Sequence, residues 1–170
     1  MSKENQSTNF ELVGKFHEFY DHDKPHDIQI NALTEKPKLV DFRFGLIMSE
    51  IDELKDAIAK KNMIEVIDGL GDVAYTVYGM AQALGINLDQ AFKIIHESNM
   101  TKACETELEA IETIEEYNMK PNFENISVKY RMSTDGKYYI IYNADTGKIL
   151  KSKNFIEPDF TPLHPLLTKN

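Results

Sequence analysis

The chain contains a single cysteine, Cys104, and no tryptophan among its 170 residues. One cysteine excludes a disulfide within the chain and leaves no cysteine set for zinc, so we expect a reducing compartment. Cationic side chains are also scarce, because 19 Lys and Arg stand against 28 Asp and Glu and give a net charge of −9. This charge argues against a nucleic-acid-binding protein and against a protein of anionic membrane surfaces.

Long apolar runs are missing as well. No uninterrupted apolar segment reaches the roughly 20 residues that span a bilayer, and Lys3, Glu4 and Asn5 precede any apolar run. We therefore expect no signal peptide, no membrane association and a cytoplasmic location. With 170 residues, of which 42% are hydrophobic and 28% charged, the chain suits a single domain with its own core.

Several catalytic motifs are absent from the sequence. There is no G-x-x-x-x-G-K-[ST] phosphate loop, no G-x-G-x-x-G and no G-x-S-x-G. Glu-x-x-His does not occur, which removes the usual signature of a di-iron helical bundle. The lone cysteine lacks the neighbours that nucleophilic catalysis needs. Any chemistry must therefore come from other side chains.

Apolar residues recur with helical period over the first two thirds of the chain. A capping box at residues 8–11 opens a first helix that ends near residue 20. A long αα-hairpin is expected from about residue 38 to residue 85, with its turn at residues 60–62. A further helix is expected over residues 88–102.

The sequence pattern changes toward the C-terminus. A glutamate-rich amphipathic helix is expected over residues 105–116, and the β-rich stretches 138–142 and 148–150 predict a small hairpin. We therefore predict a mainly α protein, a helical bundle with a short C-terminal β-hairpin. Residues 38–104 would form the helical core of this single domain of residues 1–170, and residues 125–170 the hairpin and an irregular tail.

Two groups of acidic residues lie within the expected helical hairpin. Glu50 and Glu53 belong to its first helix, and Glu65, Asp68 and Asp72 to its second. On helical wheels each group falls beside the apolar stripe of its own helix, and the second group gathers within about 60° of arc. If the hairpin turns at residue 61, Glu50 is level with Asp72 and Glu53 is level with Asp68.

Carboxylates in one layer repel each other unless a cation lies among them. Oxygen-only ligands select a hard cation, so we expect Mg²⁺ or Mn²⁺ here. Acidic residues on a helix more often form a solvated face. The prediction therefore rests on two features taken together: both groups lie beside the apolar stripes of their helices, and they lie at the same height along the hairpin. Glu65 is the weakest member, because Asn62 and Glu65 also spell a variant capping box. The four candidate ligands are Glu50, Glu53, Asp68 and Asp72.

The E-x-x-E of the first helix, followed by an acidic group ending in Asp, resembles the all-α nucleoside triphosphate pyrophosphohydrolases. This superfamily includes the MazG-type enzymes and the phosphoribosyl-ATP pyrophosphohydrolases, and the segment 98–102 (SNMTK) is similar to the corresponding segment of the second group. The resemblance covers about residues 39–102, and residues 129–160 more loosely. The family's second motif, commonly E-x-x-D, has two registers here: Glu65 with Asp68, or a register ending at Asp72 in which Gly69 stands at the Glu position.

The resemblance implies a metal-dependent nucleotide pyrophosphohydrolase that yields a monophosphate and pyrophosphate. Glu53 or Glu65, whichever has less of its charge engaged by metal, is the candidate general base for the attacking water. The residues alone leave two other classes open. One is a catalytically inactive helical interaction protein that retains the family's metal-binding shell, and the other is a structural, cation-binding bundle.

Three residues outside the acidic groups are candidates for substrate contact. Asn99 and Lys102 lie three apart on one helix face, and the resemblance implies that they meet the nucleotide and its phosphates. A polar helix end, where the dipole favours Lys, is the plainer explanation. Arg43 is expected at a phosphate, or alternatively in an ion pair with Glu50.

Glycines on the second long helix bear on assembly. Gly69, Gly71 and Gly79 permit close approach of another helix, although each costs up to about 1 kcal/mol relative to alanine. The resemblance implies bundles built across a subunit interface, so we expect a homodimer or homotetramer. The alternative is a monomer whose glycines only accommodate its own neighbouring helix. The base and sugar of the nucleotide stay open.

Overall fold

The computed structural model describes residues 7–168. The chain forms two compact units: the first runs up to Phe92 and takes in the chain from Phe160 onward, and the second is Lys93–Asp159. Whether both belong to the single domain expected from the sequence stays a prediction. None of the helices in residues 7–168 combines the length and the apolar character needed to cross a membrane.

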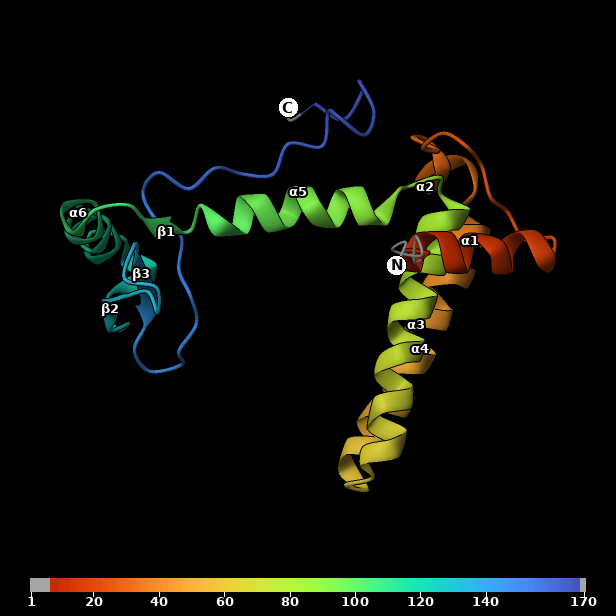
Figure 1. The fold of residues 1–170 in the computed structure, drawn as a ribbon, viewed down its shortest axis with the longest axis horizontal. Coiled ribbons are helices and arrows are strands. Elements are labelled where there is room, and N and C mark those ends of the chain that lie inside the picture. The colour runs from red at the N-terminus through yellow and green to blue at the C-terminus, as the bar shows by residue number, and fades with distance from the viewer. Residues whose placement is uncertain (1–6, 169–170) are drawn as a thin grey trace, which may run out of the picture. The chain divides into compact units, whose positions relative to one another are not determined.

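The first unit is helical, and Figure 1 labels its elements. They are α1 (Asn9–Phe19), α2 (Ala32–Glu35), α3 (Pro37–Ala59), α4 (Met63–Ala83) and the start of α5 (Leu88–Met100). The predicted capping box opens α1: Thr8 Oγ1 accepts from Glu11 N at 3.3 Å, and Glu11 Oε2 accepts from Thr8 N at 2.9 Å. Helix α1 packs on α4 and buries Val13, Gly14 and His17.

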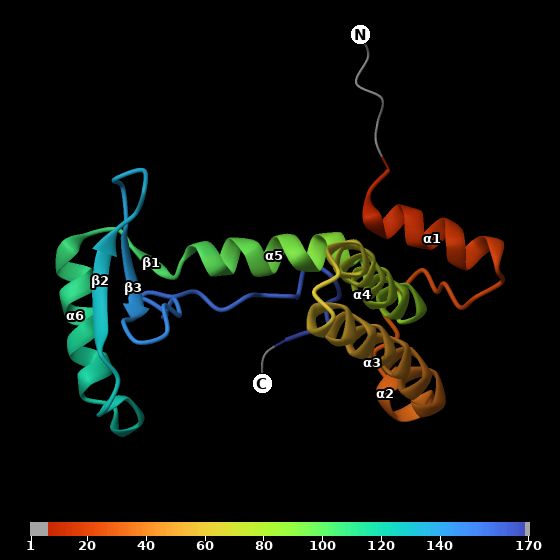
Figure 2. The ribbon, with the colours of Figure 1, turned by 90° about the horizontal axis from the view of Figure 1, so that it is seen from below.

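Helices α3 and α4 form the predicted antiparallel hairpin and lie side by side in Figures 1 and 2. Pro37 begins α3, where its missing N–H costs no helical hydrogen bond. The turn between the helices places Lys61 at φ 55°, and Asn62 Oδ1 caps α4 by accepting from Ile64 N at 3.2 Å. Gly85 ends this region at φ +70°, as expected, and a Cβ there would lie 2.2 Å from the Asp27 carbonyl oxygen.

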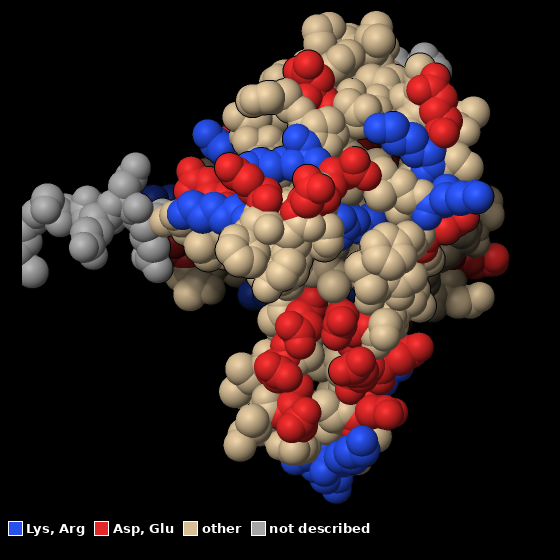
Figure 3. All heavy atoms as spheres, turned by 90° about the vertical axis from the view of Figure 1, so that its right-hand side faces the viewer, with Lys and Arg blue, Asp and Glu red and all other residues tan. Residues whose placement is uncertain are grey.

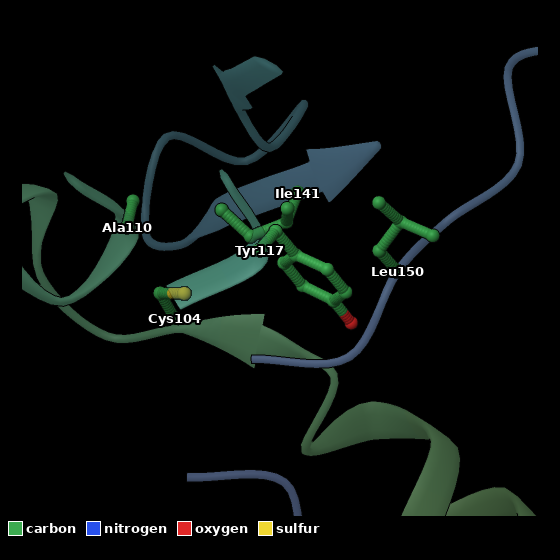
Figure 4. Packing of buried hydrophobic residues seen from close by; sticks show 5 residues of the cluster. All are labelled: Cys104, Ala110, Tyr117, Ile141 and Leu150. Carbon is green, nitrogen blue, oxygen red and sulfur yellow. The ribbon is translucent and has the colours of Figure 1, made fainter. Parts of the chain in front are cut away.

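The second unit places a small sheet against a helix. Its elements are the end of α5, β1 (Ala103–Cys104), α6 (Glu107–Asn118), the 3₁₀ helix η1 (Pro121–Phe123), β2 (Val128–Met132) and β3 (Tyr139–Asn143). The strands pair antiparallel in the order β1-β3-β2, and Figure 2 shows β2 and β3 beside α6. The core residues that meet between helix and sheet are Cys104, Ala110, Tyr117, Ile141 and Leu150 (Figure 4).

The fold class is confirmed as mainly α, but the sheet contains more strands than the predicted hairpin. Strand β3 pairs with β2, which precedes it, through a register that includes Tyr130 opposite Ile141. The stretch 148–150 folds back on β3 as predicted, through an antiparallel bridge between Ile149 and Tyr142. Asn143 N donates to the Lys148 carbonyl oxygen and Leu150 N to the Ile141 carbonyl oxygen, each at 2.9 Å. The turn that joins β2 to β3 uses Gly136 at φ +72°, so a glycine-containing turn was the missed signal.

Candidate metal and nucleotide site

Acidic side chains gather along one face of the α3–α4 hairpin, as Figure 3 shows. Glu50 is half-buried, whereas Glu53, Asp68 and Asp72 are exposed. Both helices supply members because each acid lies on the flank of its helix, beside the stripe that packs the two helices together. The candidate site is therefore built on two rigid elements rather than on loops.

The pKa of Glu50 shows which charges surround it. Burial raises the pKa of this carboxyl above its usual range, and the negative charges of Glu53, Asp72 and Asp68 raise it further. These three residues, together with Glu50, are the four candidate ligands that the sequence singled out. The structure thus brings all four into one electrostatic neighbourhood, while their role as metal ligands stays a prediction.

The four carboxylates do not form a closed ligand cage. Within residues 7–168, no three His, Cys, Asp or Glu side chains already surround a position for a metal ion. Like charges favour separated rotamers, which accounts for this open arrangement. The donors are all carboxylate oxygens, which suit Mg²⁺ or Mn²⁺ and not a soft metal.

Glu65 lies one turn nearer the hairpin loop and is exposed. The capping box that was its structural alternative does not form: Asn62 accepts from Ile64 N, and within the described chain the Glu65 carboxylate makes no return bond to Asn62. Capping therefore does not occupy this carboxylate. Glu65 is also not among the charges that act on Glu50, whereas Asp68 and Asp72 both are.

The glycines of α4 differ in what surrounds them. A Cβ at Gly69 would lie 3.2 Å from both Cα and Cβ of Leu54, so Gly69 lets α3 approach closely at the level of the acidic residues. A Cβ at Gly71 would meet nothing within 4 Å. Gly69 therefore accommodates the neighbouring helix of its own chain. This is the role that the glycines would have if the protein were a monomer.

Arg43 lies at a buried position of α3, and its contact with a phosphate stays a prediction. It forms no ion pair with Glu50; instead it is buried, with 7% of its surface exposed. A Cβ at Gly79 would lie 3.6 Å from both Arg43 Nη1 and His17 Nε2. Burial lowers the pKa of Arg43, and the negative charge of Asp23 opposes that shift.

His17 of α1 is a buried polar residue that the sequence analysis did not single out. It is 1% exposed, and its Nδ1 lies 2.7 Å from the Asp23 carbonyl oxygen. Burial is the largest cause that lowers the pKa of His17, and the positive charge of Arg43 adds to it. A histidine within an aromatic helical stripe was the signal that could have identified it.

Aromatic side chains surround the His17 end of α1. The Phe16 ring meets the Tyr75 ring edge to face at 5.5 Å between centroids, and the His22 ring lies 5.3 Å from that of His17. Between α1 and α4 lies a cavity of about 230 Å³ lined by Asn9, Leu12, Val13, Gly71, Ala74, Tyr75 and Tyr78. Apolar and aromatic walls of this kind suit a flat ring.

The remaining candidates, Asn99 and Lys102, belong to the second unit, at and just beyond the end of α5. Asn99 is exposed, Lys102 is half-buried, and Lys102 N donates to the Asn99 carbonyl oxygen at 3.2 Å. Two lysines of the C-terminal region are already paired, Lys151 with Glu157 and Lys153 with Glu112.

Two comparisons with known proteins bear on this chain. Residues 13–99 match the family model described as phosphoribosyl-ATP pyrophosphohydrolase. An uncharacterized protein of Acanthamoeba polyphaga mimivirus is 31% identical, over 93% of this chain and 96% of the viral protein. The family match contains α3, α4 and all five acidic candidates, and the similarity to the viral protein extends across both units.

Proposed function

The chain belongs to the phosphoribosyl-ATP pyrophosphohydrolase family, within the MazG-like all-α superfamily, and we propose that it is a metal-dependent nucleotide pyrophosphohydrolase. The proposed reaction splits a nucleoside triphosphate, or a related nucleotide, into a monophosphate and pyrophosphate. One observation supports the proposal beyond family membership: Glu50 is half-buried, and burial together with the negative charges of Glu53, Asp72 and Asp68 raises its pKa. A set of carboxylates that repel each other is suited to a cation and its polyphosphate ligand.

In this proposal the metal ligands are Glu50, Glu53, Asp68 and Asp72. When bound there, Mg²⁺ or Mn²⁺ supplies positive charge that offsets the polyphosphate and lowers the pKa of water. Glu50 is the half-buried member, so it anchors the set from α3, while Asp68 and Asp72 approach from α4. The missing side chain of Gly69 lets α4 approach Leu54 of α3 closely at this level, where an added Cβ would lie 3.2 Å from the Cα of Leu54.

A carboxylate must also take the proton of the attacking water. Glu53 and Glu65 are the candidates, since each is exposed and can face a substrate on the open side of the hairpin. Glu65 is not engaged in helix capping, which leaves it available for this role. Water attacks phosphorus, the pyrophosphate leaves with the electrons of the broken P–O bond, and the carboxylate holds the released proton.

Asn99 and Lys102 are proposed to contact the nucleotide, on the resemblance of the segment 98–102. An ammonium group at a phosphate acts as a compact point charge, and an amide can orient a ribose or base. Asn99 is exposed and Lys102 forms no ion pair within residues 7–168, so both side chains can bind a substrate.

The assembly we propose is a homodimer or homotetramer. Three apolar side chains on one stripe of α4, Met63, Ile67 and Leu70, are 68%, 66% and 56% exposed. Apolar stripes of this kind on a long hairpin typically mark a protein interface. A second copy is the occupant that we propose, because a four-helix arrangement would pair two such hairpins.

The proposal is tested by measuring pyrophosphate release from a panel of canonical and modified nucleoside triphosphates with Mg²⁺ or Mn²⁺. At least one nucleotide should be hydrolysed, and chelation of the metal should stop the hydrolysis. Asp72→Asn should abolish the hydrolysis although the variant still folds. Lys102→Ala should instead raise KM more than it lowers kcat. If nucleotides bind but none is hydrolysed under any condition, the chain is the inactive family member that keeps its metal-binding shell.

A further inference from the structure

The second unit contains a cavity of about 440 Å³ beside the end of α5, β1 and the first turn of α6. Four of its lining residues are apolar or aromatic: Met100, Ala103, Tyr138 and Ile156. Two are carboxylates, Glu105 and Glu109, and the other described lining residues are polar and uncharged. A space of this size fits a small organic ligand. Every lining residue follows residue 99, where the family match ends.

Glu109 is the buried carboxylate of this cavity. It is 8% exposed, and its Oε2 accepts from Glu105 N at 2.9 Å. In the part of the chain that the structure describes, Glu109 forms no ion pair. Lys153 interacts with it electrostatically, but this lysine does not line the cavity and pairs with Glu112 at 2.6 Å. A buried carboxylate without a paired cation gains stability from a cation that reaches it through the cavity.

Three further features of the cavity favour a cation. Glu105 is exposed and, among residues 7–168, has no ion-pair partner. Helix α5 ends at Met100, and the C-terminal end of a helix dipole is negative. The Tyr138 ring stacks on no other ring and no Lys or Arg of the described chain, so its face is open to a cation.

We propose that this cavity binds a linear organic polycation, an alkyl chain that carries two or more ammonium groups. One ammonium donates to the buried Glu109 and a second to Glu105, because an ammonium offers three N–H donors to a carboxylate. The methylene groups between them lie along the apolar side chains of Met100 and Ile156. A metal ion would gain nothing from those apolar walls. The site belongs to the second unit, so the inference does not depend on the proposed function.

The test is calorimetric titration of the full chain with spermidine, with Mg²⁺ present to compete at the acidic α3–α4 hairpin. Spermidine should bind at a single site. N-acetyl-lysine amide carries one ammonium on an alkyl chain and can form only one of the two ion pairs. It should therefore bind about fivefold or more weakly than spermidine.

Three variants locate the bound spermidine. Glu109→Gln keeps the shape of the side chain and an acceptor for Glu105 N, and it should weaken binding about tenfold or more because the buried charge is lost. Glu115→Gln removes the same charge from an exposed position of α6, so this matched control should stay within about twofold of the wild type. Asp72→Asn, in the acidic hairpin, should also leave spermidine binding within about twofold.

A fourth variant keeps the test decisive if Glu109→Gln fails to fold. Glu105 is exposed, so Glu105→Gln should melt with the wild type and weaken spermidine about two- to fivefold. No binding at millimolar spermidine, or no effect of Glu105→Gln, would overturn the proposal. If Glu115→Gln or Asp72→Asn weakens spermidine as much as Glu109→Gln does, general charge attraction accounts for the binding. Equal affinity for N-acetyl-lysine amide would show that the site binds one ammonium and not a polycation.

Discussion

Gly69 of α4 lies directly against Leu54 of α3, where an added Cβ would approach the Cα of Leu54 to 3.2 Å. This contact lies at the level of the acidic residues, because Leu54 directly follows Glu53 and Gly69 directly follows Asp68. The absent side chain thus sets how closely the two helices that supply the carboxylates approach each other. A glycine inside a helix costs up to about 1 kcal/mol, and here the close packing offsets that cost.

The glycines of α4 should respond to alanine in opposite directions. Gly69→Ala should lower the free energy of unfolding by about 1–3 kcal/mol, because the new methyl group meets backbone and not a flexible side chain. Gly71→Ala should raise it by about 0.5–1 kcal/mol through helix propensity alone, since a Cβ there meets nothing within 4 Å. Urea denaturation of both variants checks this pair. Stabilisation by Gly69→Ala would show that the packing described here is absent in solution.

Divalent cations should stabilise the protein. Because burial and three neighbouring carboxylates raise the pKa of Glu50, millimolar Mg²⁺ or Mn²⁺ should raise the melting temperature by several degrees. Glu50→Gln should blunt that rise, whereas Asp56→Asn, an exposed change on the same helix, should leave it intact. Differential scanning calorimetry with and without metal measures the effect, and equal responses of the two variants would contradict the assigned ligand set.

Acidification should destabilise the fold through His17. Burial lowers its pKa below about 6.5, and Arg43 and His22 lower it further against the opposing effect of the Asp23 backbone and carboxylate. The unfolded chain then binds more protons than the native one, so stability is complete above about pH 7 and falls as the pH drops through 6.5, with a slope of up to about 1.4 kcal/mol per pH unit.

Chemical denaturation at several pH values between about 5.5 and 7.5 measures that slope. His17→Gln should make it shallower even if its overall stability is lower, because glutamine does not titrate. His26→Gln, at an exposed loop position, serves as the control and should keep the wild-type slope. An unchanged slope in His17→Gln would mean that His17 is protonated in the native state.

Assembly should depend on the exposed apolar stripe of α4. Ile67→Lys should convert a dimer or tetramer to a monomer in light scattering at micromolar concentration, because an unpaired charge in an apolar interface is costly. Leu108→Lys changes an equally exposed residue of α6, 65% against 66%, and should leave the oligomeric state unchanged. A fully active wild-type monomer at high dilution would contradict a site shared between subunits.

The helical hairpin was predictable from the sequence because its determinants are local. Thr8 and Glu11 spell the capping box that opens α1, and Gly85 marks the end of the α4 region by adopting a positive φ. The vertical alignment of Glu50 with Asp72 was predicted from helix geometry alone. In the structure the negative charge of Asp72 is among those that act on Glu50.

Tertiary contacts account for what the sequence did not reveal. The burial of Arg43 near Gly79 and His17 depends on how α1, α3 and α4 pack. Helical periodicity alone does not predict that burial. Strand pairing is similarly non-local: besides the following stretch, β3 pairs with the preceding β2 and with β1. Neither the burial of Arg43 nor the strand order of the sheet is encoded in a short window of residues.

The central claim is that this acidic hairpin supports cleavage of a nucleotide at its α-phosphate with release of pyrophosphate. Phosphorus-31 NMR of a nucleoside triphosphate incubated with the protein and Mg²⁺ or Mn²⁺ tests it most directly, because it identifies the bond that is broken. The account predicts resonances of the monophosphate and of pyrophosphate in equal amounts, and none from Asp72→Asn. Formation of a diphosphate with orthophosphate, or an unchanged triphosphate for every nucleotide tested, would contradict it.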